Sequence, residues 1–553
     1  MTEPRIDYSL GDCQSAVNGA LEKMRRENLI ERVRAKDYTL WKSKPDEIVN
    51  RLGWLDAPAE TLGKLHDIHS VLEPLMAKNI DDAVLLGIGG SSLAADVFSK
   101  IFGSAPDYPR LHIIDTTDPV FISQVVQRLN LGKTLFFVSS KSGSTLEVTS
   151  LFKYFYNLCL KNSGKEAGRQ FIFITDEGSP LIKTAKNISA HHVFLNNPDI
   201  GGRYSALSLP GIVPAALIGI NVEKLLKRVV SQVENLTNAG ASLGASLGML
   251  ALNGRNKLTF ILPPRWKSFG DWLEQLIAES TGKEGKGILP VLDEQISNKN
   301  IYEKDRVFVF FQNRGNEKLS QIQSLIKAGH PVIRIKINDK YDLGTQMFIW
   351  EMSTVVAAHF LDVNPFDQPD VEATKKHTRA VIADNKKRKT KEKPALTFAQ
   401  GEICGNISGE TPAKTLIKFL RQARTGDYIC LQVYLSPSPE IDKAVKQLRK
   451  AISKKYAMPV TFGYGPRYLH STGQLHKGDS GNGLFIQLTQ GNQLDVDIPD
   501  DIGKKKSSLT FGTLKDAQSH GDCKALTDKG RKIIRVHFPG DPVTGLQTIA
   551  GLL

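Results

Sequence analysis

The stretch Ala83-Val-Leu-Leu-Gly-Ile-Gly-Gly-Ser-Ser-Leu-Ala-Ala-Asp-Val-Phe-Ser-Lys-Ile-Phe102 decides the fold class. Its apolar beginning, residues 83–88, has the length of a buried strand, and a glycine-rich turn leads into a helical stretch at Ser92. Further apolar runs lie at residues 111–114, 134–138, 170–174 and 192–195, with helical stretches between them. Buried strands that alternate with helices predict a parallel α/β sheet.

A second series of the same kind follows a helical connection at residues 209–236. The similar size of the two halves predicts a duplicated α/β fold, although their sequences show no clear repeat. The predicted strands of the second series are residues 258–262, 306–311 and 331–337, and its helices are residues 268–278, 318–328 and 344–360.

These patterns divide the chain into four segments. Residues 1–80 are predicted to be helical, residues 81–236 and 237–393 to form two α/β domains, and residues 394–553 to form a C-terminal unit. The C-terminal unit is α/β or α+β, and its sheet order is left open. Its predicted strands lie near residues 428–435, 483–488 and 532–536, and its predicted helices near residues 440–454 and 513–520.

The charge of the chain, +14, suggests an anionic ligand or a nucleic acid. Much of the excess is local, because Lys375 to Lys393 contains nine Lys or Arg residues against Asp384 and Glu392. A run of this kind is typical of a solvated helix or linker. No basic segment with interleaved aromatic residues and no helix-turn-helix pattern is evident, so we expect no nucleic-acid partner.

The cysteines and the apolar segments indicate the compartment. The five Cys residues are scattered and form no Cys-x-x-Cys pair, which is typical of the reducing cytosol. The N-terminus lacks the apolar core of a signal peptide, and no apolar run reaches membrane-spanning length. We therefore expect a cytoplasmic protein without a membrane partner.

The first motif is the turn Leu86-Gly-Ile-Gly-Gly-Ser-Ser-Leu-Ala94. Its glycines let the backbone approach a ligand, and Ser91 and Ser92 add hydroxyl groups at a helix N-terminus, which favours anions. A glycine turn after a strand is common in α/β folds. The turn lacks the full dinucleotide spacing and a Walker lysine, so NAD and ATP fit it poorly.

The second motif, Phe137-Val-Ser-Ser-Lys-Ser-Gly-Ser-Thr-Leu-Glu147, also joins a strand to a helix. Its hydroxyl groups and Lys141 form a dense set of donors, which suits the phosphate of a sugar phosphate. The alternative is a serine-rich helix cap, although a cap needs only one hydroxyl group.

The third motif is Trp272-Leu-Glu-Gln-Leu-Ile-Ala-Glu-Ser-Thr-Gly-Lys-Glu-Gly-Lys-Gly287. Gln275 and Glu279 are four residues apart, so they share a helical face that leads into a segment rich in Gly and Lys. A carboxylate beside an anion-binding segment can serve as a general base for a phosphorylated substrate. The alternative is a surface glutamate on an amphipathic helix.

The first two loops resemble the sugar isomerase domain, a phosphosugar-binding, flavodoxin-like fold. Three later segments are similar to the arginine, catalytic-glutamate and C-terminal lysine motifs of the phosphoglucose isomerase family: residues 201–205, residues 275–283, and residues 364–372 followed by Lys375. The resemblance spans about residues 20–390 and is closest to the isomerase part of bacterial fusions of transaldolase with phosphoglucose isomerase. The residues before Ala83 are too few for a transaldolase barrel of about 250 residues.

The resemblance implies a role for each matching residue. Glu279 would be the base, Arg203 would face the developing enediolate oxygen, and Lys375 would act near the ring oxygen. The substrate-binding residues implied by the family are Ser140, Lys141, Ser142 and Thr145 for the phosphate, Gly90 and Ser91 for the sugar, and Gln275 and Gln368 as further sugar contacts.

A ring-opening histidine is missing from its usual place in this family, because residues 280–329 contain no His. The C-terminal loop at residues 463–478 is dense in polar residues, and we expect His476, or failing that His470, to take this role. His330 and His359 remain alternatives, although structural roles suit both better. A metal site on the two loop histidines would lack a third ligand nearby, so we expect no metal.

The resemblance implies an enzyme that interconverts glucose 6-phosphate and fructose 6-phosphate by base-catalysed proton transfer through an enediolate. Such a redox-neutral reaction needs no cofactor, and family members are commonly dimers, so we expect a homodimer. The alternatives are a non-catalytic phosphosugar-binding regulator, against which Glu279, Arg203 and Lys375 argue, and a nucleic-acid-binding protein. Activity on mannose 6-phosphate is left open.

Overall fold

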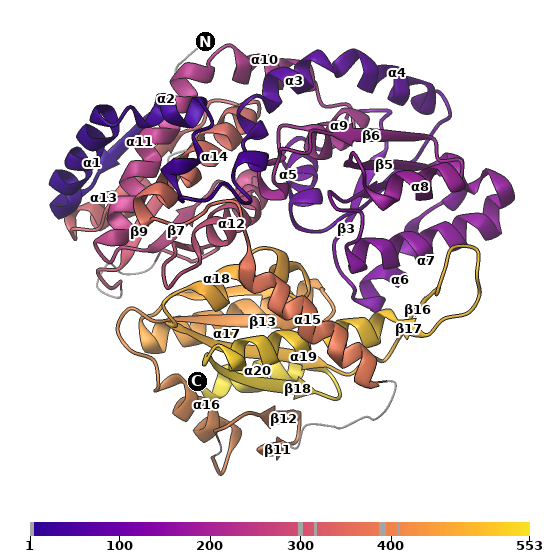
Figure 1. Ribbon diagram of the computed structural model, residues 1–553. Helices are drawn as coiled ribbons and strands as arrows, with labels where there is room; N and C mark the ends of the chain where they lie inside the picture. Colours follow the sequence, from indigo (N-terminus) through magenta and orange to yellow (C-terminus); the bar gives the residue numbers. More distant parts are fainter. Residues whose placement is uncertain (1–4, 297–301, 314–317, 386–393, 408) are drawn as a thin grey trace.

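The structure is a computed structural model that describes residues 5–296, 302–313, 318–385, 394–407 and 409–553. Within these residues the strands form two five-stranded sheets, one six-stranded sheet and a two-stranded ribbon (Figure 1). The end of the predicted basic stretch, residues 386–393, lies outside the described residues.

The first sheet has five parallel strands in the order β3-β2-β4-β5-β6. All residues of β2 and β4 are buried, because helices cover both faces of the sheet. Strands and helices alternate as the sequence predicts: β2 Asp82–Leu86, α5 Leu93–Phe102, β3 Arg110–Ile114, α6 Pro119–Arg128, β4 Thr134–Ser139, α7 Leu146–Ser163, β5 Phe171–Asp176, α8 Pro180–Asn187 and β6 His192–Asn196.

The second sheet has the order β1-β10-β9-β7-β8, in which the last four strands are parallel. The predicted helical connection consists of α9 (Leu209–Leu217), α10 (Val222–Val230) and the start of α11, which contains the 236/237 boundary. The remaining elements are α11 Val233–Leu252, β7 Lys257–Ile261, α12 Lys267–Thr281, β8 Leu289–Val291, β9 Arg306–Gln312, α13 Leu319–Lys327, β10 Val332–Lys336, α14 Asp342–Leu361 and α15 Pro369–Asn385.

The N-terminal segment corrects one prediction, because it is not wholly helical. Strand β1 (Ile6–Ser9) pairs antiparallel with β10 at the edge of the second sheet. Its alternation of Ile6 and Tyr8 with polar residues is a strand pattern, which is short enough to be overlooked. The helices of this segment are short and come in pairs: α1 (Gln14–Arg26) and α2 (Leu29–Arg34), then α3 (Ala57–Gly63) and α4 (Leu65–Met76).

The C-terminal unit is α/β. Its sheet has the order β11-β12-β18-β15-β13-β14, with four parallel strands and an antiparallel edge formed by β12 and β11. Its elements are β11 Leu396–Phe398, β12 Gly401–Cys404, α16 Pro412–Leu420, β13 Tyr428–Tyr434, α17 Pro439–Tyr456, β14 Val460–Tyr464, α18 Gly473–Gly478, β15 Gly483–Gln490, β16 Asp497–Ile498, β17 Leu509–Thr510, α19 Phe511–Asp528, β18 Lys532–Phe538 and α20 Pro542–Leu552.

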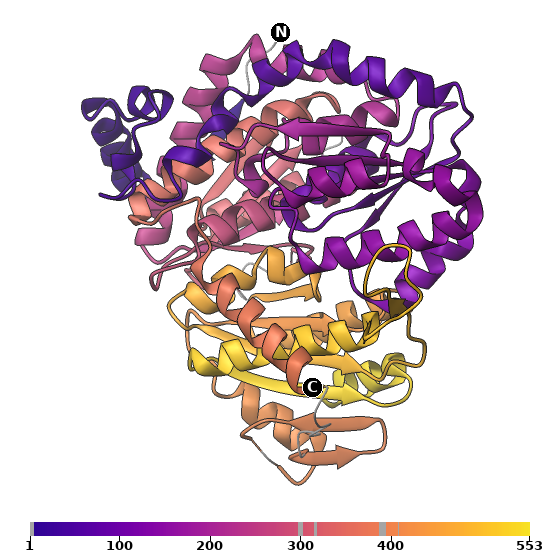
Figure 2. The same ribbon diagram turned by 45° about the vertical axis from the view of Figure 1, so that its right-hand side comes forward.

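The C-terminal unit packs against both preceding α/β domains. This packing brings its loops to the carboxyl edge of the first sheet. Side chains of β8 and α12 share an apolar cluster with Tyr428, Leu475 and Phe485. The loop that contains β16 and β17 crosses to α7, where Lys153 donates to the carbonyl of Asp500 at 2.8 Å (Figure 2). Helix α15 lies across the C-terminal unit and packs on α19.

Candidate active site

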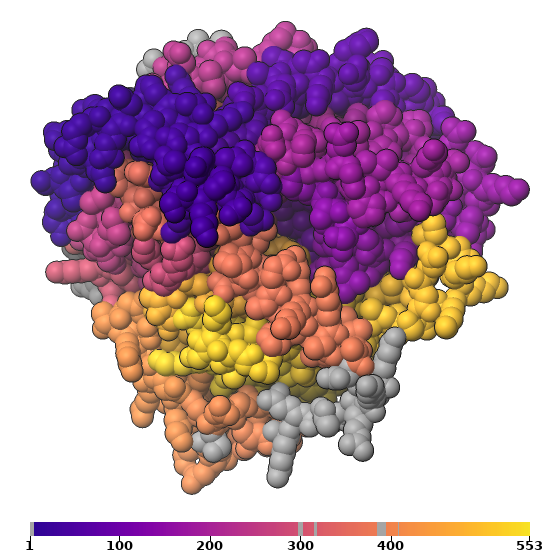
Figure 3. Space-filling view, viewed as in Figure 1, coloured from indigo at the N-terminus to yellow at the C-terminus, as the bar shows by residue number. Residues whose placement is uncertain are grey.

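A cavity of about 570 Å³ lies at the carboxyl ends of β2 and β4, where parallel sheets usually bind ligands. In the space-filling view a hollow is visible where indigo, purple and salmon residues meet above the C-terminal unit (Figure 3). The cavity wall contains every predicted site residue except His476: Gly90, Ser91, Ser140, Lys141, Ser142, Thr145, Arg203, Gln275, Glu279, Gln368 and Lys375.

Glu279 and Arg203 form a buried ion pair in this wall. The Arg203 Nη1 atom lies 3.2 Å from the Glu279 Oε1 atom, and both side chains are at least nine-tenths buried. The guanidinium is fixed by the Ser280 hydroxyl (2.8 Å) and by the carbonyl of Pro365 (2.7 Å). A buried charge pair is stable only when its other polar atoms are bonded too. The structure therefore holds a carboxylate and a cation at fixed positions beside an open cavity.

Gln275 connects the carboxylate to the C-terminal unit. Its Nε2 atom donates to Glu279 Oε2 at 3.1 Å and to the carbonyl of His470 at 2.7 Å. Its Oε1 atom is buried and has no hydrogen-bond partner among the described residues. Buried amide oxygens normally have a partner, so this one is an exception.

The last glycine of the first motif has a packing role as well as a place in the wall. A Cβ atom on Gly90 would lie 2.1 Å from the carbonyl oxygen of Gly202, so a side chain is excluded there. The close approach brings Arg203 over the turn that carries Ser91.

The loop from Ser140 to Thr145 surrounds the N-terminus of α7. Thr145 is the N-cap residue, yet its side chain makes no capping hydrogen bond, and its hydroxyl group lies 3.3 Å from that of Ser140. Helix N-terminal N–H groups without a cap bind anions well. The geometry therefore favours the predicted anion site over the alternative of a serine-rich cap.

Lys141 is less free than the motif suggested. Its ammonium group is bonded to the Asp176 carboxylate and, at 2.6 Å, to the carbonyl of Pro198. Burial raises the pKa of Asp176 despite the pairing with Lys141. The lysine therefore lies in the cavity wall with its ammonium group already bonded.

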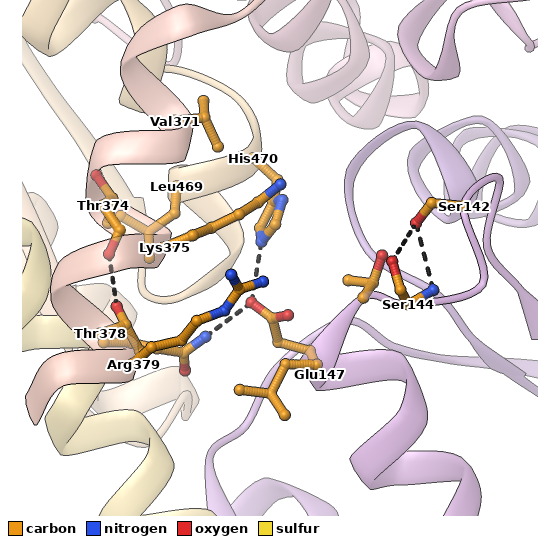
Figure 4. Close-up of a pocket in the computed structure, with 13 residues that line it drawn as sticks. Ser142, Ser144, Glu147, Val371, Thr374, Lys375, Thr378, Arg379, Leu469 and His470 are labelled. Carbon is orange, nitrogen blue, oxygen red and sulfur yellow. Dashed lines mark hydrogen bonds and ion pairs between the residues drawn. The ribbon is translucent and has the colours of Figure 1, made fainter. Parts of the chain in front are cut away.

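The loop before α15 brings Gln368 to the cavity, and the helix itself brings Lys375. Gln368 Oε1 accepts from Arg203 Nη1 at 2.8 Å, so its amide nitrogen is left for a ligand. Lys375 Nζ lies 2.6 Å from Glu372, and the lysine side chain is 43 % exposed. Lys375 and Arg379 reach into an adjoining pocket, opposite Ser142 and Ser144 (Figure 4).

His476 does not reach the cavity, which corrects the first choice for the ring-opening histidine. It lies in α18, 1 % exposed, with its ring against Phe485 and its Nε2 atom 3.5 Å from Cys430 Sγ. Burial lowers the pKa of His476 well below its usual range. Its sequence neighbours are polar, but α18 turns this side chain into the apolar cluster under the sheet.

His470, the second choice, lines the cavity together with Glu279 and Lys375. Its Nε2 atom lies 3.0 Å from Glu147 Oε1, which also accepts from Gln518 Nε2 at 2.7 Å (Figure 4). Burial by itself would raise the pKa of Glu147. The charge of His470 and its hydrogen bond to Glu147 act in the opposite direction, and the pKa of Glu147 is lowered overall.

Sequence reasoning assigned no role to several residues around the site. Glu147 and Gln518 line the adjoining pocket; Glu147 ends the second motif, and Gln518 lies in a distant helix without a signal. Arg51, from the N-terminal segment, lies in the wall of the main cavity. Among the described residues, no group of three or more His, Cys, Asp or Glu side chains is arranged to hold a metal ion.

Lys283 fixes one of the loops that form the cavity wall. Its Nζ atom donates to the carbonyls of Asn364 (2.7 Å) and Asp367 (2.6 Å), so it fixes the loop that carries Gln368. Burial, followed by the charge of Arg203, lowers the pKa of Lys283 to about 8.

Comparisons with known proteins relate part of this chain to a known family. The phosphoglucose isomerase family matches residues 71–284. A probable glucose-6-phosphate isomerase of Methanococcus maripaludis is 28% identical over 414 residues, which are 67% of this chain and 91% of the relative. The glucose-6-phosphate isomerase of Rubrobacter xylanophilus is 29% identical over 423 residues, 66% of this chain and 95% of the relative.

Two solved structures share the fold. A glucose-6-phosphate isomerase from Chlamydia trachomatis superposes with a TM-score of 0.56 at 18% identity and covers 69% of this chain and 89% of its own. A hypothetical protein from Thermus thermophilus also gives 0.56, at 24% identity, and covers 69% of this chain and all of its own.

The fold places this chain in the class of two-sheet α/β proteins that these two structures represent, as the sequence predicted. Within that class, the matching family and the named relatives confirm the predicted relationship to the phosphoglucose isomerases. None of the described helices is both long and apolar enough to span a bilayer.

Proposed function

We propose that this chain interconverts glucose 6-phosphate and fructose 6-phosphate. The observation that carries the proposal is the Glu279–Arg203 pair, 3.2 Å apart, in one cavity with the uncapped N-terminus of α7. Relatives named glucose-6-phosphate isomerase, matched over about two thirds of this chain, support it.

In the proposed mechanism Glu279 moves a proton between C2 and C1 of the open-chain sugar. A positioned carboxylate is suited to proton removal next to a carbonyl, a contribution of about 10²–10⁴-fold. Arg203 would face the oxygen on which negative charge develops, because a prepositioned cation stabilises an enediolate. Gln275 keeps one oxygen of Glu279 bonded, which orients the other.

The phosphate group of the substrate would lie at the N-terminus of α7. Ser140, Ser142 and Thr145 present hydroxyl groups there, and the uncapped N–H groups complete the site. Lys141 would contribute less than its charge suggests, because its ammonium group is already paired with the Asp176 carboxylate. Gly90 and Ser91 would line the sugar, with Gln275 and Gln368 as partners for its hydroxyl groups.

Ring opening would use Lys375 and His470. Because His470 Nε2 is bonded to Glu147, its Nδ1 atom would take the proton of the anomeric hydroxyl group. Lys375 would give a proton to the ring oxygen. His470 thus replaces His476 in the proposal.

A coupled assay of the purified chain with fructose 6-phosphate tests the proposed activity. Formation of glucose 6-phosphate supports it, whereas binding without turnover would favour the phosphosugar-binding regulator. Mannose 6-phosphate in the same assay tests whether the C2 epimer is also accepted.

Oligonucleotide binding with a steep salt dependence would support the nucleic-acid alternative. The cytosolic location and the homodimer stay predictions, and size-exclusion chromatography with light scattering tests the latter.

A further inference from the structure

Arg467 and three carboxylates meet where the C-terminal unit touches both sugar isomerase domains. Arg467 Nε lies 3.1 Å from Asp115, and its Nη2 atom lies 3.4 Å from Asp96 and 3.8 Å from Asp271. Each carboxylate comes from a different place: Asp96 from α5, Asp115 from the residue after β3, and Asp271 from α12. A single arginine therefore connects the C-terminal unit to both sugar isomerase sheets.

The charges in this cluster depend on Arg467. Asp96 is 5% exposed and Asp115 is 8% exposed, so neither carboxylate is well hydrated. Lys100 neutralises one of them, since its Nζ atom lies 2.8 Å from Asp96. Removing the guanidinium would leave buried carboxylates facing each other, which is strongly unfavourable.

The same turn carries the proposed ring-opening residue. The 3-10 helix that spans Arg467–His470 is a single turn, in which the first and last side chains lie on the same side. At its far end the carbonyl of His470 accepts from Gln275 at 2.7 Å, and a Cβ atom on Gly89 would lie 3.1 Å from His470 Cβ. His470 therefore has little space to move as long as the turn keeps its position against Gly89 and Gln275.

The turn is also fixed to its own unit. The Tyr468 hydroxyl group donates to Asp522 at 2.7 Å, and Tyr468 and Leu469 are 2% and 6% exposed. These contacts bind the turn to the C-terminal unit. Arg467 binds the start of the turn to the other two units, while His470 at its end contacts Gln275 and Glu147. Arg467 is thus the charged contact that sets where the start of the turn lies against the cavity.

We propose that Arg467 is a positioning residue: its ion pairs with Asp96, Asp115 and Asp271 hold the turn so that His470 faces the substrate. The inference rests on the proposed isomerase function and on His470 as the ring-opening group. A lysine should replace Arg467 only in part, because an ammonium group is a point charge, whereas a guanidinium has donors that reach several carboxylates at once.

The test compares Arg467→Gln and Arg467→Lys with the wild-type chain on two substrates. The first is fructose 6-phosphate, which must open its ring. The second is 5-deoxyfructose 6-phosphate, which lacks the hydroxyl group that closes the ring, and whose C1 proton exchange is followed in deuterium oxide. Arg110→Gln is the matched control, since Arg110 pairs with Asp82 at the amino-terminal end of β2, away from the cavity.

We expect Arg467→Gln to lower kcat with fructose 6-phosphate about 10- to 100-fold, because a displacement of about 1 Å by a remote substitution can cost about 100-fold. KM and the exchange rate of the 5-deoxy analogue should change little, and Arg467→Lys should recover part of kcat. Arg110→Gln should match the wild type. If Arg467→Gln does not fold, Asp271→Asn takes its place, since the Asp271 side chain is 43 % exposed. It should lower kcat with fructose 6-phosphate by a smaller factor and leave the exchange rate of the analogue unchanged.

Two results would overturn the inference. One is an Arg467→Gln enzyme that loses thermal stability but keeps its kcat, which would make the cluster merely structural. The other is an equal loss on both substrates, which would mean that the turn acts through Gln275 and Glu279 rather than His470. A wild-type chain without isomerase activity would instead reject the proposed function itself.

Discussion

Glu279 Oε1 lies 3.2 Å from Arg203 Nη1, although the two residues come from different parts of the chain. Glu279 lies in α12, and Arg203 follows the last strand of the first sheet. The pair therefore spans the two sheets and fixes a carboxylate and a cation on one wall of the cavity. Both charges are held in place before any substrate arrives.

Glu279→Gln should keep the fold and the binding of substrate but lose proton transfer. We expect kcat to fall at least about 10²-fold, the lower end of what general-base catalysis contributes. Steady-state kinetics with fructose 6-phosphate measures this. Glu284→Gln, at an exposed glutamate paired with Lys42, serves as the control and should be unchanged. Wild-type turnover by Glu279→Gln would remove Glu279 from the role of base.

The double substitution Ser140→Ala with Thr145→Ala should weaken phosphate binding. Each lost hydrogen bond to a charged group is worth about 1.5–3 kcal/mol, so KM should rise at least about tenfold. Thr149→Ala is the control, since its hydroxyl group bonds only to carbonyls of its own helix region. An unchanged KM in a folded double variant would place the phosphate elsewhere.

His470 and His476 should behave differently. His470→Ala should lower kcat with fructose 6-phosphate while proton exchange in an open-chain analogue continues. His476→Ala should instead destabilise the C-terminal unit by about 2 kcal/mol or more, the range for large-to-small changes in a core, since the ring packs on Phe485. Thermal melts and kinetics on both variants separate the two effects. A stable His476→Ala protein that has lost ring opening would reverse the assignment.

Lys283 should make stability depend on pH at alkaline values. Burial lowers its pKa from the usual 10.5 to about 8, so between these values the unfolded chain binds more protons than the folded chain. The free energy of unfolding, compared with that of Lys283→Met, should therefore rise from pH about 8 to about 10.5, by about 3 kcal/mol at 1.36 kcal/mol per unit. Denaturant titrations across this range measure it, with Lys286→Met as the control. A flat difference would mean that folding does not lower the pKa of Lys283.

The alternation of strands and helices was readable from the sequence because it is local. A fully buried strand such as β2 is a continuous apolar run, and the glycine turn after it has a fixed geometry. The same holds for the loop from Ser140 to Thr145 and for Gln275 and Glu279, which share a helical face. Short or edge elements were missed: β1 was read as part of a helical segment, and β8 was not recognised, since a few residues have no clear period.

The order of the sheets and the partners of the site were decided only by tertiary structure. His470 and His476 lie in one polar loop sequence, yet one faces the cavity and the other lies in the core, because a short turn and α18 point their side chains in different directions. Gln518 reaches Glu147 only because the C-terminal unit packs on the first sheet. The motifs indicate which chemical groups this chain offers to a ligand. Long-range packing decides which residues of the C-terminal unit join them, because contacts between distant segments produce no periodic pattern in the sequence.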